Sequence, residues 1–304
     1  MRRQWLVGVV VVGALVLGAG LIVWVSTQGL LGPGGKARHL LGQADQAIAR
    51  GQWTDAQSQL EQLIGTFPDS PWTDDGLLKL GQVYEQEQQV AEAVKVYRLL
   101  LEKFPSSPLA GEAQTRLGAA DVALLFSPTI ADGDVSYAVK PNDSLGKIAA
   151  ANHTTVELLK RANGLSGDVI RPGKKLKVPT GQFRILVDKS QNQLLLTRGD
   201  RFFKAYHVST GKDNSTPVGT FKVVNKVPNP NWYTQGAVVP PDSPNNILGT
   251  RWMGFDKPGY GIHGTTDPAD IGQQVTAGCV RMRNPEVEEL FAIVPLGTEV
   301  VIVD

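Results

Sequence analysis

The sequence predicts a multidomain α+β protein, in which an apolar N-terminal helix precedes helical repeats, a small β-α-α-β module and a mostly-β domain. Three observations lead to this fold class. An uncharged run begins at Trp5, a helical segment repeats itself with an offset of 37 residues, and apolar and polar residues alternate along much of the chain beyond Gln182. A chain of 304 residues is also long enough for several domains.

The overall composition excludes several classes of function. The net charge is +1 and the Lys and Arg residues are scattered, so we expect no nucleic-acid partner. One cysteine cannot form an internal disulfide or a zinc cluster. The four histidines lie far apart in the sequence and do not show metal-ligand spacing. We therefore expect neither a metal nor a cofactor.

Residues 1–28 are predicted to be a cytoplasmic stub followed by a transmembrane signal anchor. The run Trp5–Val25 has 21 residues, which as a helix would span about 31 Å, enough to cross a bilayer. Arg2 and Arg3 precede it, which favours an N-terminus in the cytoplasm. The alternative is a cleaved signal peptide, whose apolar core would be only about 7–15 residues. Both interpretations place the body of the protein outside the cytoplasm, and the first anchors it to the membrane.

Residues 36–126 read as helices and contain an internal repeat. The stretch Phe67–Gly81 matches Phe104–Gly118, and the helices upstream of both stretches match at the same offset. The Phe-Pro-x-Ser-Pro segments should end one helix of each pair, because proline cannot continue a helix. The segment resembles tetratricopeptide repeats, which implies paired helices. A surface that docks a protein partner and a plain spacer both remain open.

Residues 135–180 predict a compact β-α-α-β unit. A strand at Tyr137–Val139 leads to a first helix capped by Asp143 or Ser144, and Thr155 begins a second helix. The stretches "YAVKPNDSLGKIA", "LLKRANGL" and "IRPGKKLKVP" make this unit similar to a LysM module. The resemblance implies binding to the N-acetylglucosamine backbone of peptidoglycan or chitin. Asn142 stands where glycine is usual, but asparagine also tolerates positive φ.

Residues 181–304 predict a mostly-β domain with a helix at Pro285–Val294, and it contains the single cysteine. His263 precedes Cys279 by 16 residues. A neighbouring imidazole, or backbone N–H groups, would lower the pKa of the thiol and make Cys279 a nucleophile. Gly278 would let backbone N–H groups form an oxyanion hole, and the carbonyl of Gly264 could hold one nitrogen of His263. A buried apolar role for Cys279 is the alternative.

The residues around this pair resemble the L,D-transpeptidase (YkuD) catalytic domain. The shared pattern is a histidine followed by "TAGCVRMRN", together with "GIHGT" and the upstream stretch "VSTGKDNSTPVGTF". The resemblance covers nearly all of residues 182–304. Ala277 departs from the pattern, because many members carry His or Arg there. That departure bears on substrate fit and on rate.

The resemblance implies a reaction on peptidoglycan stem peptides. Cys279 would attack the carbonyl between the L-centre of a diamino acid and a terminal D-Ala, with His263 as general base and acid. A second stem's amine would then form a 3→3 cross-link. Four residues are substrate-binding candidates: Arg281, Thr276, Tyr260 and Trp252. Ordering of the nucleophile loop by Arg281 and Thr276, and core packing of the two aromatic residues, are alternatives.

Three other interpretations compete with this one. Water as acceptor would make the protein an L,D-carboxypeptidase. A decayed catalytic domain would leave a non-catalytic cell-wall-binding scaffold, which Ala277 alone supports. A papain-like protease is disfavoured, because here the histidine precedes the cysteine. The resemblance also implies acylation of Cys279 by carbapenems.

Overall fold

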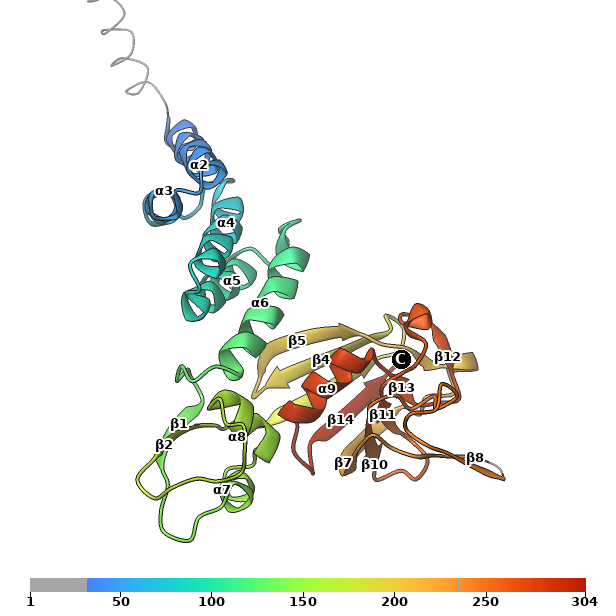
Figure 1. Ribbon diagram of the computed structural model, residues 1–304. Helices are drawn as coiled ribbons and strands as arrows, with labels where there is room; N and C mark the ends of the chain where they lie inside the picture. The colour runs from blue at the N-terminus through green and yellow to red at the C-terminus, as the bar shows by residue number, and fades with distance from the viewer. Residues whose placement is uncertain (1–31, 235) are drawn as a thin grey trace, which may run out of the picture. The chain divides into compact units, whose positions relative to one another are not determined.

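The computed structural model describes residues 32–304 except residue 235. The chain divides into two compact units, Met1–Ala113 and Gln114–Asp304, and we describe each by itself (Figure 1). The predicted membrane anchor at residues 1–28 lies outside the described residues. Within the described residues, no helix is both long enough and apolar enough to cross a bilayer.

The described part of the first unit is a series of antiparallel helices. These are α2 (Pro33–Ala49), α3 (Trp53–Thr66), α4 (Thr73–Gln86), α5 (Val90–Lys103) and the start of α6 (Ala110–Leu125). Phe67 and Phe104 cap the C-terminal ends of α3 and α5. The Phe-Pro-x-Ser-Pro segments therefore end these helices, as the sequence predicts.

Repeat-related residues pack the interior of this unit. Ala56 and Ala93 are fully buried, and so are Leu60 and Tyr97, which occupy matching positions of the two repeats. Tyr97 packs against Gly81 of α4 so closely that a Cβ on the glycine would lie 2.2 Å from the tyrosine ring. A small residue at position 81 is therefore required for this helix pair to pack.

The second unit begins within α6 and continues into the β-α-α-β module. The module consists of β1 (Asp134–Ala138), α7 (Leu145–Ala151), α8 (Val156–Ala162) and β2 (Lys175–Pro179), and β1 pairs antiparallel with β2. Ser144 and Thr155 cap the two helices, since their side chains accept from the N–H groups of Lys147 and Leu158. Asn142 adopts φ 66°. These are the features that the sequence predicts for the module.

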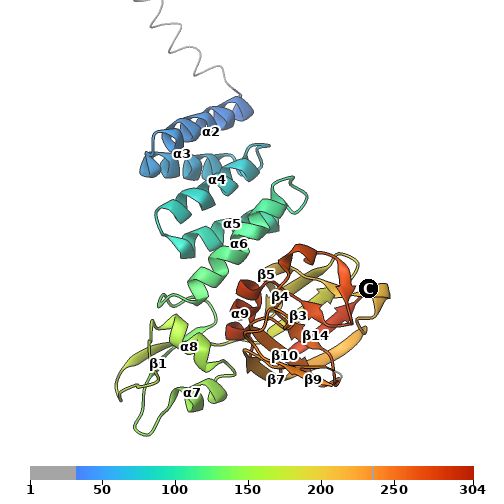
Figure 2. The same cartoon turned by 45° about the vertical axis from the view of Figure 1, so that its right-hand side comes forward.

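The rest of the second unit is built on an eight-stranded mixed sheet, with α9 (Asn284–Ile293) packed against it (Figure 2). In spatial order the strands are β13 (Val280–Arg281), β11 (Gly261–His263), β10 (Arg251–Phe255), β7 (Gly219–Pro228), β14 (Glu299–Val303), β3 (Phe183–Asp188), β4 (Gln193–Arg198) and β5 (Arg201–His207). Two small sheets join β6 (Thr210–Gly211) to β12 (Gln274–Thr276) and β8 (Trp232–Thr234) to β9 (Ala237–Val239). Two 3₁₀ turns, η1 (Lys212–Asn214) and η2 (Pro268–Asp270), complete the domain.

The module and the sheet share buried contacts within this unit. Leu158 of α8 belongs to the same apolar cluster as Val287 and Leu290 of α9. Thr155 donates a hydrogen bond from its hydroxyl to the carbonyl of Ala292 near the end of α9. The module is therefore packed onto the sheet domain through α8 and α9.

A buried charge cluster ties the same two parts together. The Lys177 ammonium lies 3.2 Å from one carboxylate oxygen of Asp134, and the Arg198 guanidinium lies 2.8 Å from the other. The side chains of Lys177 and Asp134 are each 1% exposed. Lys177 also donates to the carbonyls of Leu124 and Ser127, at 2.7 and 3.0 Å. Each charge in this cluster therefore has fixed partners.

Candidate active site

His263 and Cys279 are brought together by parallel pairing of β11 with β13 at one edge of the large sheet. Ile262 lies opposite Val280, and His263 lies opposite Arg281. Cys279 directly precedes β13, so one step back along this register places it beside Gly261. Because side chains alternate along a strand, Cys279 and Arg281 fall on the same face as His263.

His263 is held in one tautomer by the chain itself. Its side chain is buried, and Nδ1 lies 2.6 Å from the carbonyl oxygen of Gly264. A carbonyl can only accept, so Nδ1 carries the proton and Nε2 is left as an acceptor. Burial lowers the pKa of His263 to about 4, with Arg281 acting in the same direction and the Gly264 hydrogen bond opposing it. The imidazole is therefore neutral at neutral pH.

Cys279 is half-buried and has one weak hydrogen bond, from Sγ to the carbonyl of Gly259 at 3.5 Å. Burial raises the pKa of the thiol above its usual value, although the Gly261 N–H group and the Arg281 guanidinium pull it down. The expectation of a lowered thiol pKa is therefore wrong for the resting site. Burial outweighs the groups that favour the thiolate.

The turn before Cys279 is shaped by Thr276 and Gly278. The Thr276 hydroxyl donates to the Cys279 carbonyl at 2.6 Å and accepts from the Gly278 N–H at 3.2 Å. Gly278 adopts φ 130°, and a Cβ there would lie 2.8 Å from the ring of Tyr260. The Gly278 N–H is thus already engaged. By contrast, the N–H of Cys279 has no hydrogen-bond partner within the described part of the chain.

The "STGKDNSTPVG" stretch packs against the same turn. β6 pairs with β12, the strand that leads into the turn. A Cβ on Gly211 would lie 3.0 Å from the Cα of Gly278, and the Gly211 N–H donates to the Thr216 hydroxyl at 2.7 Å. The upstream motif therefore acts by packing under the turn that carries Cys279.

Trp252 lies beside the imidazole. It is the antiparallel partner of His263, and the two rings stack with centroids 6.0 Å apart and planes 23° apart. Its indole N–H donates to Asn225 Oδ1 at 3.0 Å, and Cβ atoms on Gly254 or Gly261 would lie within 3.0 Å of the indole. The two glycines thus leave room for the indole next to His263.

The two arginines of the motif differ in their surroundings. Arg281 pairs through its backbone with Ser209, and its side chain is 14% exposed with Nη1 4.0 Å from Asp270. Arg283 is exposed and lies 3.4 Å from Glu286. Arg283 also lines a cavity of about 750 Å³, together with Pro244, Thr265, Thr266, Asp267, Pro268, Asn284 and Pro285.

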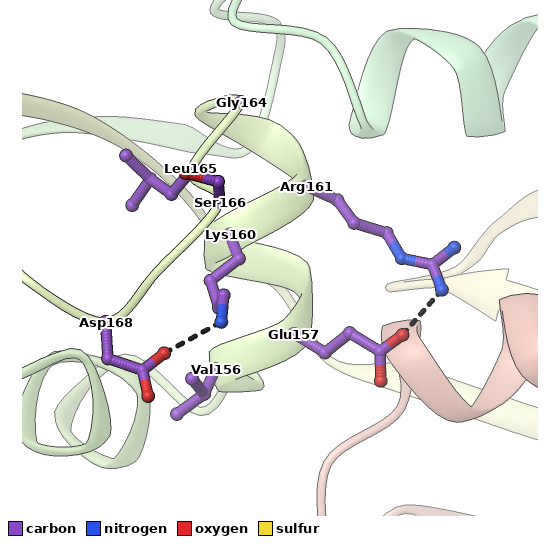
Figure 3. Close-up of a pocket in the computed structure, with 8 residues that line it drawn as sticks. All are labelled: Val156, Glu157, Lys160, Arg161, Gly164, Leu165, Ser166 and Asp168. Atoms are coloured by element: carbon purple, nitrogen blue, oxygen red, sulfur yellow. Dashed lines mark hydrogen bonds and ion pairs between the residues drawn. The ribbon is translucent and has the colours of Figure 1, made fainter.

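A second hollow lies on the β-α-α-β module, along α8 and the loop that follows it. Its volume is about 720 Å³, and Figure 3 shows the residues that line it. The Lys160–Asp168 pair, at 2.8 Å, spans it, and the Glu157–Arg161 pair lies along α8 (Figure 3). The remaining lining residues are Val156, Gly164, Leu165 and Ser166. The hollow therefore combines charged side chains with an apolar floor.

In the part of the chain that the structure describes, residues 32–304 except 235, no three His, Cys, Asp or Glu residues lie close enough together to hold a metal ion.

The sequence analysis missed the roles of two asparagines in the site. Asn225 orients Trp252, and Asn284 accepts from two backbone N–H groups. Asn284 ends the quoted "TAGCVRMRN" stretch directly before a proline. That place at a helix start was the available signal.

A thiol and a neutral imidazole on adjacent strands are typical of enzymes that use a cysteine–histidine pair. Comparisons with known proteins identify the class. Family models match the L,D-transpeptidase catalytic domain (YkuD) at residues 182–302, the LysM domain at 137–179 and tetratricopeptide repeats at 39–70 and 75–107. The three predicted resemblances are thereby confirmed. The LysM and catalytic domains are those of a cell-wall-associated, extracytoplasmic protein.

Curated relatives give the family. YkuD of Bacillus licheniformis, an L,D-transpeptidase by name, is 38% identical over 172 residues, which cover 54% of this chain and 96% of the relative. YqjB of Bacillus subtilis is 42% identical over 126 residues, covering 40% of this chain and 70% of the relative. The chain belongs to the L,D-transpeptidase (YkuD) family, and it is an enzyme.

Solved structures are similar at lower identity. An L,D-transpeptidase from Mycobacterium smegmatis is 18% identical with a TM-score of 0.35, over 43% of this chain and 64% of that chain. An Enterococcus faecium L,D-transpeptidase is 21% identical with a TM-score of 0.35, over 45% and 56% of the two chains. The family assignment rests on the sequence matches.

Proposed function

We propose that the protein is a peptidoglycan L,D-transpeptidase in which Cys279 is the nucleophile and His263 the general base and acid. The observation that carries the proposal is the pairing of β11 with β13, which puts a buried imidazole and the chain's single thiol on one face. The Gly264 carbonyl supports it further, because it leaves Nε2 as the acceptor for the thiol proton.

The reaction proceeds in two acyl transfers. The Cys279 sulfur attacks the carbonyl between the diamino acid's L-centre and the terminal D-Ala of a tetrapeptide stem, while the thiol proton moves to His263 Nε2. The C–N bond breaks, the proton passes to the departing D-Ala amine, and a thioester remains. The side-chain amine of a second stem then attacks the thioester, the C–S bond breaks, and His263 carries the amine proton to the Cys279 sulfur, which leaves a 3→3 cross-link and the free thiol.

The surrounding groups have distinct roles in this proposal. The free N–H of Cys279 stabilises the developing oxyanion, and Gly278 contributes its conformation rather than its own N–H. Thr276 holds the turn in shape. Arg281 has a buried Nε without a partner in the described part of the chain, and its partly exposed guanidinium is the candidate contact for a stem carboxylate. Trp252 and Tyr260 line the substrate side of the sheet.

The other domains bring the catalytic domain to its polymer. The LysM module binds the glycan, and the hollow along α8 offers polar pairs and an apolar floor for a sugar ring. The run Trp5–Val25 anchors the chain in the membrane, and the helical repeats dock a protein partner. Each of these assignments is separable from the catalytic one.

The direct test uses the full-length chain and disaccharide tetrapeptides. We expect D-Ala release and a cross-linked dimer by mass spectrometry, both absent in Cys279→Ala. Release of D-Ala with only a disaccharide tripeptide as product would assign carboxypeptidase action instead. A folded wild type that releases no D-Ala from the tetrapeptide would contradict the proposal.

A further inference from the structure

Asn284 occupies a slot between two segments of the site. It is the first residue of α9, and its Oδ1 accepts from the N–H groups of Thr250 and Thr265, at 3.2 and 3.1 Å. Both partners are donors, so the atom that faces them must be the amide oxygen. A Cβ on Gly249 or on Gly264 would lie 2.2 Å from that oxygen. The two glycines therefore leave the room in which the Asn284 oxygen reaches both N–H groups.

One of the two N–H groups belongs to the peptide unit that holds the base. The Thr265 N–H and the Gly264 carbonyl are parts of one planar amide, so fixing the direction of one fixes the other. That carbonyl accepts from His263 Nδ1 at 2.6 Å. Hydrogen bonding at the N–H also polarises the amide and strengthens its carbonyl as an acceptor. The Asn284 oxygen thus acts on His263 through a single amide.

The other contacts of Asn284 connect it to three parts of the site. The Thr250 N–H lies at the start of β10, the strand that carries Trp252. The Gly264 N–H donates to the carbonyl of Arg251 at 3.1 Å, which ties the base segment to the same strand. Asn284 itself follows Cys279 by five residues in the sequence. One oxygen therefore joins the nucleophile segment, the base segment and β10.

We propose that Asn284 is a positioning residue that fixes the tautomer and orientation of His263 through the Gly264–Thr265 amide. The inference rests on the proposed role of His263 in catalysis. Without the Asn284 oxygen, this amide is free to turn and the Nδ1–H bond weakens. Part of the imidazole then carries its proton on Nε2, where it cannot accept the thiol proton.

The expected kinetic effect falls on turnover rather than on binding. Misplacing a reacting group by a fraction of an ångström to about one ångström costs up to about 100-fold in rate. We expect Asn284→Ala to lower kcat by about 10- to 100-fold with KM changed less than about threefold. Asn284→Asp keeps an oxygen for both N–H groups and should restore most of kcat. Its negative charge should also raise the pKa of His263, because a nearby anion favours imidazolium.

The decisive experiment is ¹⁵N NMR of the full-length chain labelled at its four histidines, with His263 assigned by its loss in His263→Gln. Near pH 7, the wild type and Asn284→Asp should carry the His263 proton on Nδ1 alone. Asn284→Ala should show a mixture of tautomers. Asn163→Ala is the matched control, because Asn163 also satisfies backbone groups, in the β-α-α-β module, through Lys177 and Leu159.

The outcomes separate cleanly. An unchanged His263 tautomer and unchanged kcat in Asn284→Ala would overturn the proposal, and so would an equal change in Asn163→Ala. If Asn284→Ala does not fold by circular dichroism, Asn284→Ser takes its place, since its shorter side chain cannot reach both N–H groups. The tautomer is read without turnover, so a wild type that releases no D-Ala would contradict the proposed function and leave this result standing.

Discussion

Two buried polar clusters in the second unit differ in how many hydrogen-bond and ion-pair partners their groups have. In the cluster of Lys177, Asp134 and Arg198, each group has partners at 2.7–3.2 Å, and the Asp134 carboxylate opposes the lowering of the Lys177 pKa by burial. At the candidate active site, His263 has one backbone partner and Cys279 has one contact at 3.5 Å. Burial therefore lowers the pKa of His263 to about 4 and raises that of Cys279, which keeps both groups neutral.

The difference shows that partners, and not burial alone, decide whether a group stays charged. The charge cluster is satisfied and contributes to holding the module on the sheet. The candidate catalytic pair has fewer partners, since His263 bonds to one carbonyl and Cys279 has one long contact. Burial raises the pKa of the Cys279 thiol, so under the proposed mechanism we expect proton transfer to His263 to accompany the attack on the substrate.

Removing the thiol should abolish activity and leave the stability of the protein nearly unchanged. We expect Cys279→Ala to lower D-Ala release by at least about 1000-fold, because it removes the nucleophile. The urea midpoint should shift by less than the equivalent of about 1 kcal/mol, since Cys279 is half-buried with one weak contact. Product mass spectrometry and equilibrium unfolding measure the two effects.

A carbapenem supplies an independent readout of the same thiol. A mass adduct on the wild type should disappear in Cys279→Ala, whereas Ala277→His should keep it. An adduct of equal yield on Cys279→Ala would mean that another residue is acylated.

Breaking the charge cluster should lower the stability of the protein and leave its activity nearly unchanged. Asp134→Ala leaves Lys177 and Arg198 without their shared carboxylate, and removing one partner of a buried ion pair costs about 3–5 kcal/mol. We expect a loss of that size in the free energy of unfolding, measured in urea. Activity per folded molecule on soluble muropeptides should change little.

An exposed pair in the eight-stranded sheet is the control. Arg184 and Glu299 are 3.6 Å apart and their side chains are 53% and 40% exposed, so Glu299→Gln should cost less than about 1 kcal/mol. Equal losses in Asp134→Ala and Glu299→Gln would remove the distinction between the two kinds of pair.

The low pKa of His263 sets the acid limb of activity. The base must be neutral, so kcat/KM should be flat from about pH 5 to 8 and fall tenfold per unit below about pH 4. An acid limb centred near the ordinary imidazole value of about 6.5 would contradict a resting neutral histidine.

Acid unfolding has to be excluded in that measurement. Because the folded pKa of His263 is lowered, its contribution to stability is full above about pH 6.5 and declines as pH falls toward 4, by roughly 3 kcal/mol in all. His263→Gln should lack this loss. Activity that returns after a jump back to neutral pH shows that the enzyme stayed intact or refolded.

The sequence predicted several of the described turns, caps and helices because their signals are local. The Phe-Pro-x-Ser-Pro turns, the caps at Ser144 and Thr155 and the helix before Val294 depend on neighbours in the chain, and the structure contains them. The contact between His263 and the Gly264 carbonyl was also expected, since the two residues are adjacent.

Features of the site that depend on distant segments were not predictable. The pKa of Cys279 depends on how much of the sheet covers it, which residue types alone do not give. By contrast, the hydrogen bond from the Gly278 N–H to Thr276 joins residues two apart in the chain and agrees with the expectation that Thr276 orders the nucleophile loop. Asn225 and Asn284 act on segments that lie 27 and 19 or more residues away, so their partners could not be read from neighbouring residues, although the place of Asn284 before a proline marks a helix start.

The most direct test of the resting state is a thiolate titration. The chain has one cysteine, so the absorbance near 240 nm of wild type minus Cys279→Ala reports Cys279 alone, with the six tyrosines cancelled. We expect the midpoint of the difference signal to lie at higher pH than that of a free cysteine titrated under the same conditions, because burial raises the pKa of this thiol. A thiolate signal already at its plateau by about pH 7 would show a preformed ion pair with His263 and contradict the account.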